Sequence, residues 1–193
     1  GENVLVEING FTVIFTSNAD WNGTETLTFM VDDSQGRAVA TDDIDVVVTP
    51  VNDTPVLTEI SDQETNEDTP LVLTLDVTDV DEDELIFDVI SSSPWDVSAN
   101  IAGDELTLTP AENFYGDVQI NVSVTDGEYS DSEVFTLIVL SVNDAPTIDL
   151  PASVTFDEDG SYTEDFSIYI DDIDEDELSL SVTGGENVLV EIN

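Results

Sequence analysis

The sequence repeats itself, and this repetition constrains the fold more than any other feature. Residues 1–9, GENVLVEIN, recur unchanged as residues 185–193, which lie 184 positions later. A shorter repeat is also present, because VNDTP at 51–55 returns as VNDAP at 142–146, 91 positions later. Self-similarity at a fixed period indicates an array of equivalent structural repeats. The longer period then corresponds to a pair of repeats of about 91 residues each.

This repeat divides the chain into three parts. Residues 56–146 are predicted to form one complete repeat. Residues 1–55 are predicted to be the C-terminal half of another repeat, and residues 147–193 the N-terminal half of a third. A further match agrees with this division, because WNG at 21–23 corresponds to FYG at 114–116. Joined end to end, the two halves would give a second complete repeat of about the same size.

Short strands are indicated along each repeat. Apolar and polar residues alternate in 71–77, 106–108, 118–124 and 134–139, which is the pattern of strands with one face in solvent. No stretch shows a sustained 3.6-residue apolar period, so long helices are not expected. About seven short strands in a repeat of this size predict an all-β fold of tandem immunoglobulin-like, Greek-key β-sandwich domains in a linear array.

Turn residues and apolar positions add detail to this prediction. Gly103-Asp104 predicts the tip of a hairpin, and Asn9-Gly10 is the equivalent loop in the first part. The residues expected in the core of the complete repeat are Leu73, Leu75, Val77, Leu85, Phe87, Leu106, Leu108, Phe114, Ile120, Val122, Val124, Phe135 and Leu137.

The charge of the chain is extreme. There are 46 Asp and Glu residues, one Lys or Arg and no His, which gives a net charge of −45. Two carboxylates about 4 Å apart repel by roughly 1 kcal/mol in water and by about 4 kcal/mol at an effective dielectric of 20. Because the chain supplies almost no cations, the counter-cations for clustered carboxylates must come from solution.

The same composition excludes several classes of protein. Nucleic acid and anionic membrane surfaces would be repelled, so neither is expected as a partner. The apolar runs are too short to insert in a membrane. A hydrophobic fraction of 40%, arranged in alternation, argues against an acidic disordered tail. The absence of Cys leaves no disulfides and no thiolate chemistry.

Three carboxylates follow a predicted strand at alternate positions, in Asp79-x-Asp81-x-Asp83. They would converge on one ion if they lie in a loop, and would point to one solvent face if the strand continued. Calcium takes six to eight hard oxygen ligands of this kind. An EF-hand is excluded, because its sixth position would be Glu84 instead of Gly and its twelfth Ile90 instead of Glu.

The order of the acidic motifs resembles that of the cadherin repeat. The chain has Asn-Glu-Asp at 66–68, Asp-x-Asp at 79–81, a polar segment before a strand at 112–113, Asp126 after a strand, and a closing Asn-Asp-x-Pro. The closing motif is especially similar to the Val-Asn-Asp-x-Pro linkers of bacterial cadherin-like tandem repeats in large surface adhesins. In cadherins, Ca²⁺ ions lie between successive domains. The resemblance therefore implies calcium as the cofactor and neighbouring repeats as partners.

The resemblance also implies which residues bind calcium. One junction would use Glu67, Glu112, Asn113, Asn143, Asp144, Asp172 and Asp174. The other would use Asp20, Asn52, Asp53, Asp79, Asp81 and Asp126. One departure concerns the linkers, because Pro50 and Ser141 stand where cadherin linkers typically carry a first carboxylate. The number of ions at each junction is therefore left open.

Each motif alone also has a purely structural interpretation. The Asp-x-Asp-x-Asp segment could be a solvated turn, and Asn-Asp-x-Pro suits a turn by composition. Glu67 and Glu158 could be surface residues before a strand, and Asp126 could cap the turn at Asp126-Gly127. The recurrence of the whole set in register favours calcium binding over these separate interpretations.

The predicted function is a calcium-rigidified, extracellular repeat of a large bacterial surface adhesin, acting as a stalk or spacer at the cell surface or in a secreted protein. An enzyme is not expected, because without His, Cys or Lys only paired carboxylates are available for catalysis.

Two further functions stay open. The first is a carbohydrate-binding module of a secreted polysaccharide-degrading protein, for which the aromatic candidates are Trp21, Trp95, Tyr115 and Tyr129. Trp21 aligns with Phe114, which favours a core role for that position. The second is a head-to-tail filament, in which residues 147–193 of one copy complete residues 1–55 of the next; the other origin of these halves is a longer array from which this sequence is a window.

Overall fold

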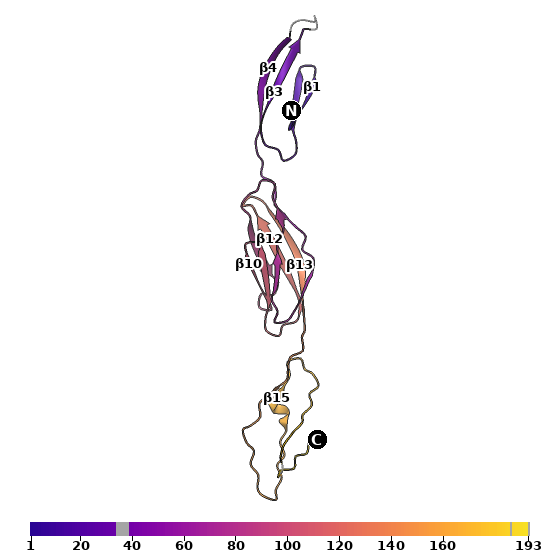
Figure 1. Ribbon diagram of the computed structural model, residues 1–193, viewed down its shortest axis with the longest axis vertical. Coiled ribbons are helices and arrows are strands. Elements are labelled where there is room, and N and C mark those ends of the chain that lie inside the picture. Colours follow the sequence, from indigo (N-terminus) through magenta and orange to yellow (C-terminus); the bar gives the residue numbers. More distant parts are fainter. Residues whose placement is uncertain (34–38, 186, 193) are drawn as a thin grey trace. The chain divides into compact units, whose positions relative to one another are not determined.

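The computed structural model describes residues 1–33, 39–185 and 187–192 (Figure 1). Within this part of the chain the fold is all-β, as predicted, with one short 3₁₀-helix and no α-helix. No helix in these ranges has the length and apolarity needed to cross a membrane. The elements are β1 (Val4–Asn9), β2 (Thr12–Ser17), β3 (Gly23–Asp32), β4 (Val39–Val48), β5 (Val56–Leu57), β6 (Gln63–Asn66), β7 (Leu71–Thr74), β8 (Val77–Thr78), β9 (Ile86–Ser91), β10 (Val97–Ala102), β11 (Glu105–Pro110), β12 (Gly116–Thr125), β13 (Ser130–Leu140), β14 (Thr147–Ile148), η1 (Phe166–Tyr169) and β15 (Ile170–Asp171).

The described residues divide into two compact units, each built from several segments. Unit 1 comprises residues 1–60, 74–89 and 122–133, and unit 2 comprises residues 61–73, 90–121 and 134–193. The predicted complete repeat contributes residues to both. The acidic sites described below each lie within one unit.

Two hairpins have the turns predicted from the sequence. β1 pairs antiparallel with β2, from Val4↔Ser17 to Asn9↔Thr12, and β10 pairs in the same way with β11. The tips hold Gly10 at φ +64° and Gly103 at φ +67°. These left-handed conformations favour glycine, because a Cβ atom would be strained there. The Gly therefore fixes the register of each hairpin.

The larger sheets bring distant segments together. One sheet has the strand order β10–β11–β7, and a four-stranded sheet has the order β6–β13–β12–β9. In the latter, β6 pairs in parallel with β13, from Leu137↔Gln63 to Leu140↔Asn66. β3 and β4 form a separate antiparallel pair, as do β5 and β8.

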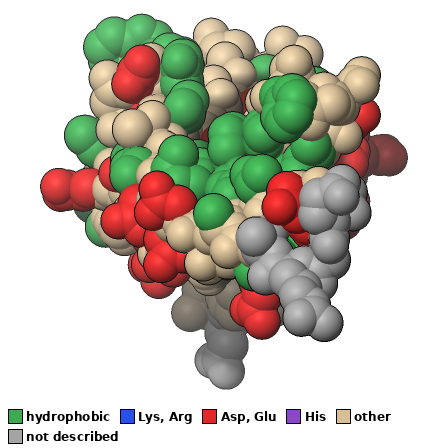
Figure 2. Space-filling model, turned by 90° about the horizontal axis from the view of Figure 1, so that it is seen from above, with side chains coloured by type: hydrophobic (Ala, Val, Ile, Leu, Met, Phe, Trp, Pro, Cys, Tyr) green, Lys and Arg blue, Asp and Glu red, His purple; other side chains and the backbone are tan. Residues whose placement is uncertain are grey.

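The core lies under the strands of the predicted complete repeat. Along β12, Val118, Ile120, Val122 and Val124 are at most 2% exposed and alternate with more exposed residues. The predicted core residues that are buried are Leu75, Leu106, Leu108, Ile120, Val122, Val124, Phe135 and Leu137. The other five, which are Leu73, Val77, Leu85, Phe87 and Phe114, are half-buried. In the view of Figure 2, apolar and acidic side chains share one face of the molecule.

The strand expected over residues 71–77 is two strands, and this prediction is corrected. β7 ends at Thr74 and β8 begins at Val77. Between them, the Asp76 carbonyl accepts from the Thr58 amide at 2.9 Å, and the Asp76 carboxylate accepts from the Thr58 hydroxyl at 3.2 Å. The chain changes partners here, because β7 belongs to the sheet with β11 whereas β8 pairs with β5.

Equivalent positions of the repeat share local backbone structure. β14 pairs with β15 through Thr147↔Asp171 and Ile148↔Ile170, as β5 pairs with β8. The non-glycine residues at positive φ also fall into equivalent pairs, which are Asp20 with Asn113, Asp68 with Asp159, and Glu82 with Glu175. All six φ values lie between 55° and 62°. At these positions the two end segments therefore have the same local backbone conformation as the complete repeat.

Candidate metal centres

Three groups of carboxylates have ligand atoms within 4.8 Å of one another in the described part of the chain. Asp79, Asp81 and Asp83 form the first, and their equivalents Asp172, Asp174 and Asp176 form the second. The third consists of Glu67, Asp68 and Asp144. The first triad is the centre of what we call the first acidic site; the other two groups together are the second acidic site.

The first triad converges because its residues lie in a folded loop. β8 ends at Thr78, and the Asp79 carboxylate then accepts from the amides of Asp81 at 2.9 Å and Asp83 at 3.3 Å. Glu82 takes φ +58°, which turns the chain back on itself. These residues therefore do not continue the strand, and the prediction that they lie in a loop applies.

The second triad repeats this loop. The Asp172 carboxylate accepts from the amides of Asp174 at 3.1 Å and Asp176 at 3.2 Å, and Glu175 takes φ +58°. The same spacing of acidic residues thus gives the same local fold in two places. The signal is in the sequence itself, because a carboxylate two residues before an amide is well placed to close such a turn.

The linker at residues 52–53 joins the first acidic site. The Asp53 amide donates to Asp81 Oδ2 at 2.7 Å, and Asn52 Nδ2 donates to Asp126 Oδ2 at 2.9 Å. Asp126 Oδ1 also accepts from the amides of Glu128 and Tyr129, so it caps the turn as well as facing the linker. Five of the six residues assigned to this junction are thereby linked.

The charge of the first site is unbalanced. Hydrogen bonds from the Tyr129 and Glu128 amides and from Asn52 lower the pKa of Asp126, although desolvation acts in the opposite direction. Desolvation and the neighbouring carboxylates of Asp79, Asp81 and Asp126 raise the pKa of Asp83. The raised pKa of Asp83 reflects the repulsion among the negative groups of this site.

One atom of the first site points to a missing partner. Asp79 Oδ2 is buried and has no hydrogen-bond partner among the described residues. A buried carboxylate oxygen without a partner is unfavourable, and such atoms in native proteins usually meet a donor, water or an ion. Together with the carboxylates of Asp81 and Asp83, this oxygen fits the donor set that Ca²⁺ prefers.

The second acidic site is held by the linker at residues 142–144. Glu67 is 4% exposed and accepts from the Val142 amide at 2.5 Å, and the Asp144 amide donates to Asp174 Oδ2 at 2.6 Å. The Asn113 amide donates to Asp68 Oδ1 at 3.1 Å. Glu67 is therefore a buried residue of this site, and the interpretation of it as a surface residue is wrong.

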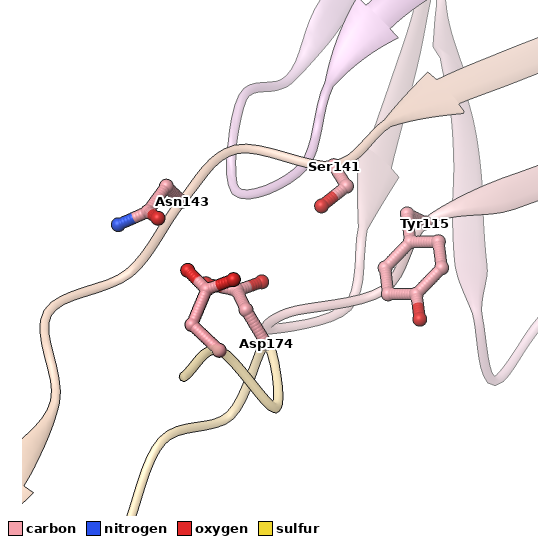
Figure 3. A pocket seen from close by; sticks show the side chains of 5 residues that line it. Tyr115, Ser141, Asn143 and Asp174 are labelled. Carbon is pink, nitrogen blue, oxygen red and sulfur yellow. The ribbon is translucent and has the colours of Figure 1, made fainter. Parts of the chain in front are cut away.

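Asp144 is surrounded by other carboxylates of the second acidic site. Desolvation raises the pKa of Asp144, and so do the charges of Asp174, Glu67, Asp68 and Asp172. Figure 3 shows the Asp174 carboxylate facing the linker that carries Ser141 and Asn143. These residues, with Tyr115 and Asp176, line a cavity of about 240 Å³ in unit 2.

Some assigned residues are not joined to the acidic groups. Asp20 is exposed at φ +58°, and it lies outside the three carboxylate groups of the described residues. Glu112 is exposed. Asn143 lines the cavity beside Asp174, and its side-chain amide donates to the Asp144 carbonyl at 2.7 Å.

Sequence reasoning left three carboxylates out of the assigned set. Asp68 lies with Glu67 and Asp144, and Asp83 and Asp176 complete the two triads. The periodicity of the repeat carried a signal for each, because Asp83 corresponds to Asp176 and Asp68 to Asp159. The repeat therefore marks site residues that a linear motif does not include.

The exposed aromatic side chains are spread over the chain. Trp95 is 90% exposed, Tyr115 62% and Tyr129 43%. Trp21 is half-buried, and its ring lies 3.1 Å from the position that a Cβ atom would occupy at Gly23. Trp21 thus packs against the start of β3, whereas Trp95 offers an open aromatic face.

Comparison with known proteins adds to this geometry. Residues 51–139 match the family described as the cadherin-like domain. This segment is a cadherin-like β-sandwich module. The module contains five of the six residues assigned to the first acidic site, and Glu67, Asp68 and Asn113 of the second. Its aspartate triad is of the type that is typical of cadherin calcium sites. A search of curated proteins finds no match.

Solved structures resemble the chain in fold. Extracellular cadherin domains 1–4 of protocadherin gamma B7 match with a TM-score of 0.51 and 18% identity over 79% of this chain and 43% of that one. Drosophila N-cadherin EC1–4 matches at 0.42 and 15%, covering 76% of this chain and 41% of that one. An endo-fucoidan hydrolase of glycoside hydrolase family 107 matches at 0.38 and 17%, covering 75% and 24%. The chain thus spans less than half the length of each, and the protocadherin likeness shows the cadherin-like sandwich fold.

Proposed function

We propose that the chain is a calcium-binding repeat segment of an extracellular bacterial adhesin, in which it acts as a stalk or spacer and not as an enzyme. The observation that carries this proposal is Asp79 Oδ2, a buried carboxylate oxygen without a partner among the described residues, inside a triad of aspartates. The neighbouring repeats of the same array are its proposed partners.

Calcium would be held by residues from three chain segments at the first acidic site. The loop offers Asp79, Asp81 and Asp83, and the linker and the β12–β13 turn offer Asn52 and Asp126. Calcium supplies the positive charge that these groups lack. Because Asp53 already donates its amide to Asp81, binding at the loop would also fix the linker.

The second acidic site would act in the same way. Glu67 and Asp68 come from before β7, Asp144 from the linker, and Asp172 and Asp174 from the following loop. Without a cation these carboxylates repel one another. A bound ion removes this repulsion and ties the segments together, so a flexible connection becomes stiff.

The energetic effect depends on the calcium concentration. Extracellular modules bind Ca²⁺ with dissociation constants of roughly 10⁻⁴ to 10⁻³ M. Each site stabilises the bound form by about 2.7 kcal/mol when free calcium is 100 times its dissociation constant. An extracellular location, where calcium is abundant, therefore suits these sites.

Calorimetric titration with CaCl₂, paired with thermal unfolding in calcium and in EDTA, tests the proposal. We expect several ions per chain and a large rise in melting temperature. Asp79→Asn should remove binding at the first site, whereas Asp104→Asn, at an exposed hairpin tip, should leave it unchanged. A titration without heat and without a shift in melting temperature would mean that the carboxylates are only a solvated surface.

Stiffening needs a separate measurement. Small-angle scattering should give a longer maximum dimension and a narrower distribution of shapes in calcium than in chelator. Identical profiles in the two buffers would leave calcium binding in place but would reject the stalk mechanism.

Carbohydrate binding is a second candidate, and the exposure of Trp95 favours it. An indole face that is 90% exposed can stack on a sugar ring. Soluble polysaccharides should then change tryptophan fluorescence, and Trp95→Ala should abolish the change while Trp21→Phe retains it. An unchanged spectrum with every polysaccharide would reject this function.

A further inference from the structure

We propose that one end of the complete repeat binds a cationic polysaccharide, which is a sugar polymer with free amino groups. This inference rests on the carbohydrate-binding function described above as a second candidate, and it names the chemical class of the ligand. The residues of the binding surface, which we call the aromatic–acidic surface, are Trp95, Tyr115, Asp96, Glu112 and Asp117. All of them lie in unit 2.

The two loops that carry the aromatic residues lie side by side. One connects β9 to β10, and the other connects β11 to β12. At one end of the first loop, the Ser92 amide donates to the Gln119 carbonyl at 2.9 Å. At its other end, the Asp96 carbonyl accepts from the Ala111 amide at 2.7 Å. Hydrogen bonds therefore join the two loops at both ends of the β9–β10 connection.

Trp95 is exposed on an ordered turn. The Ser93 carbonyl accepts from the amides of Asp96 at 3.1 Å and Val97 at 2.9 Å, and the Ser93 hydroxyl donates to the Asp96 carboxylate. Val97 is 0% exposed, so the turn is anchored to the core. The 90% exposure of Trp95 is thus a feature of a fixed turn. A surface that is ordered in advance loses little entropy when a ligand binds.

Tyr115 has open space beside its ring. The residue is 62% exposed, and it forms part of the wall of the cavity of about 240 Å³ described above. Figure 3 shows the ring near Ser141, at the rim of this cavity. A sugar ring can therefore reach the Tyr115 side chain without displacing another part of the chain.

The fold does not require aromatic residues at these two positions. In the first part of the chain, Glu2 stands at the position of Trp95 and Asn22 at that of Tyr115. Both Glu2 and Asn22 are exposed, although the complete repeat follows them in the chain. These positions are therefore in solvent in two successive repeats, and the aromatic side chains are particular to the complete repeat.

The three carboxylates of the surface are also particular to the complete repeat. Their equivalents in the first part of the chain are uncharged, namely Asn3 for Asp96, Ala19 for Glu112 and Thr24 for Asp117. Glu112 and Asp117 are exposed, and Asp96 is half-buried. None of the three belongs to the carboxylate groups of the acidic sites in the described part of the chain. The aromatic–acidic surface is therefore distinct from those sites.

Aromatic and acidic groups together select the ligand. The apolar C–H groups of a sugar ring pack on an indole or phenol face, while the polar tips of Trp and Tyr stay available for hydrogen bonds. A protonated amino group is attracted both to an aromatic face and to carboxylates. Anionic polysaccharides are repelled by a chain with a net charge of −45, and neutral ones leave the carboxylates unused. A polysaccharide with free amino groups uses both kinds of side chain.

The aromatic residues must carry the specificity, because the charge of the whole chain attracts any polycation. Attraction between exposed charges is screened by salt, with a Debye length of about 8 Å at 0.15 M ionic strength. Stacking on Trp95 and Tyr115 is not screened. Binding at the aromatic–acidic surface should therefore persist at this ionic strength, whereas attraction to the rest of the chain should largely disappear.

Two matched oligosaccharides test the inference. A glucosamine oligomer and an N-acetylglucosamine oligomer of equal length share the sugar ring, but acetylation removes the positive charge. Both are titrated by calorimetry at about 0.15 M NaCl, at a pH at which the amine is protonated and with calcium present to occupy the acidic sites. We expect the glucosamine oligomer to bind several-fold more tightly, and tryptophan fluorescence to change with the same midpoint.

Variants can take the residues that the repeat itself carries at equivalent positions. Trp95→Glu removes the ring and adds a negative charge, so binding should fall by about tenfold or more, as for an aromatic anchor, although bulk electrostatic attraction would rise. Tyr115→Asn should weaken binding several-fold. Asp117→Thr should weaken binding of the glucosamine oligomer alone. Asp104→Asn, at the exposed tip of the β10–β11 hairpin, is the charge-matched control and should change neither affinity. Circular dichroism checks that each variant is folded.

The outcomes separate this inference from the function on which it rests. Equal affinity for both oligomers, lost in Trp95→Glu, would keep carbohydrate binding and overturn the cationic class. Undiminished binding of the glucosamine oligomer to Trp95→Glu would mean general attraction of a polycation and would overturn the surface. An oligolysine with the same dependence on Trp95 would assign the surface to a basic protein and overturn the sugar ligand. No binding of either oligomer, together with no response to the polysaccharides above, would reject carbohydrate binding itself.

Discussion

The same nine residues occur twice in this chain, and the described parts of the two copies take different structures. Residues 4–9 of the first copy form β1, and Val4 is 1% exposed. Residues 187–192 of the second copy form no strand, and Val188, the equivalent of Val4, is 53% exposed. Since the sequences are identical, the difference must come from what surrounds them.

Partners account for the difference. β1 pairs with β2 over six residue pairs, and the Glu25 carboxylate accepts from the amides of Glu2, Asn3 and Val4 at 2.6, 3.0 and 2.8 Å. No strand pairs with the second copy among the residues that the structure describes. Strand formation here depends on cross-strand partners and burial more than on local propensity.

Supplying the missing partners should remove the contrast. A chain lengthened after residue 193 by a copy of residues 10–55 gives the second GENVLVEIN its own hairpin. We expect strand structure at 188–193, a second cooperative unfolding transition and slow amide exchange at Val190. An extension of equal length and composition in scrambled order is the control. Unprotected amides in the lengthened chain would mean that partners are not what separates the copies.

Core substitutions should show the same contrast energetically. Leu108 is 0% exposed, so Leu108→Ala should lower the free energy of unfolding by about 2–5 kcal/mol. Leu189 is 97% exposed, so Leu189→Ala should change it by less than about 0.5 kcal/mol. Urea unfolding followed by tryptophan fluorescence measures both. Comparable losses in the two variants would contradict the burial described above.

A smaller difference is expected within the repeated segment itself. Val4→Ala removes two buried methyl groups and should destabilise the β1–β2 hairpin by about 2 kcal/mol. Val188→Ala removes the same groups from a half-exposed position and should have little effect. Hydrogen exchange of the Val6 and Ile8 amides reports on the hairpin in each variant. The comparison fails if both substitutions loosen those amides equally.

The smallest effect concerns pH. Desolvation raises the pKa of Glu25, but hydrogen bonds from the amides of Asn3, Val4 and Glu2 lower it by more. The pKa of Glu25 in the folded chain therefore lies below its ordinary value of 4.5. A lowered folded-state pKa means that the stabilisation is complete above pH 4.5 and is lost as pH falls through the folded value. The protection factors of the three donor amides, which compare exchange with its intrinsic rate at the same pH, should fall over that range, and Glu25→Gln should flatten the dependence. A profile that is unchanged by the substitution would assign the effect to other carboxylates.

Much of the fold could be predicted because the same motifs recur at equivalent positions of the repeat. Alternation identified β11, β12 and β13, and the Gly10 and Gly103 turns followed from backbone chemistry that acts over a few residues. The change of partners at Leu75-Asp76 could not be read in this way. Alternation continues through those residues, and the hydrogen bonds that Thr58 donates to Asp76 at the break in the strand are tertiary.

The acidic sites show the same limit. The spacing of Asp79, Asp81 and Asp83 fixes a local loop, so it was visible in the sequence. Asp68 belongs to the second acidic site because the fold brings it close to Asp144, which is distant in the sequence. The sequence alone does not show this proximity. Asp20 was assigned by its place in the repeat, but it lies outside the three carboxylate groups of the described residues.

The parallel pairing of β6 with β13 has a mechanical consequence. β6 lies near the start of the complete repeat and β13 at its end, and their four paired positions run in the same direction. Tension applied through the two linkers pulls these strands past each other along their length. The pair is then loaded in shear, so all of its hydrogen bonds resist the force at the same time and do not break one after another. Resistance of this repeat to stretching would then come from the place of this one strand pair in the chain.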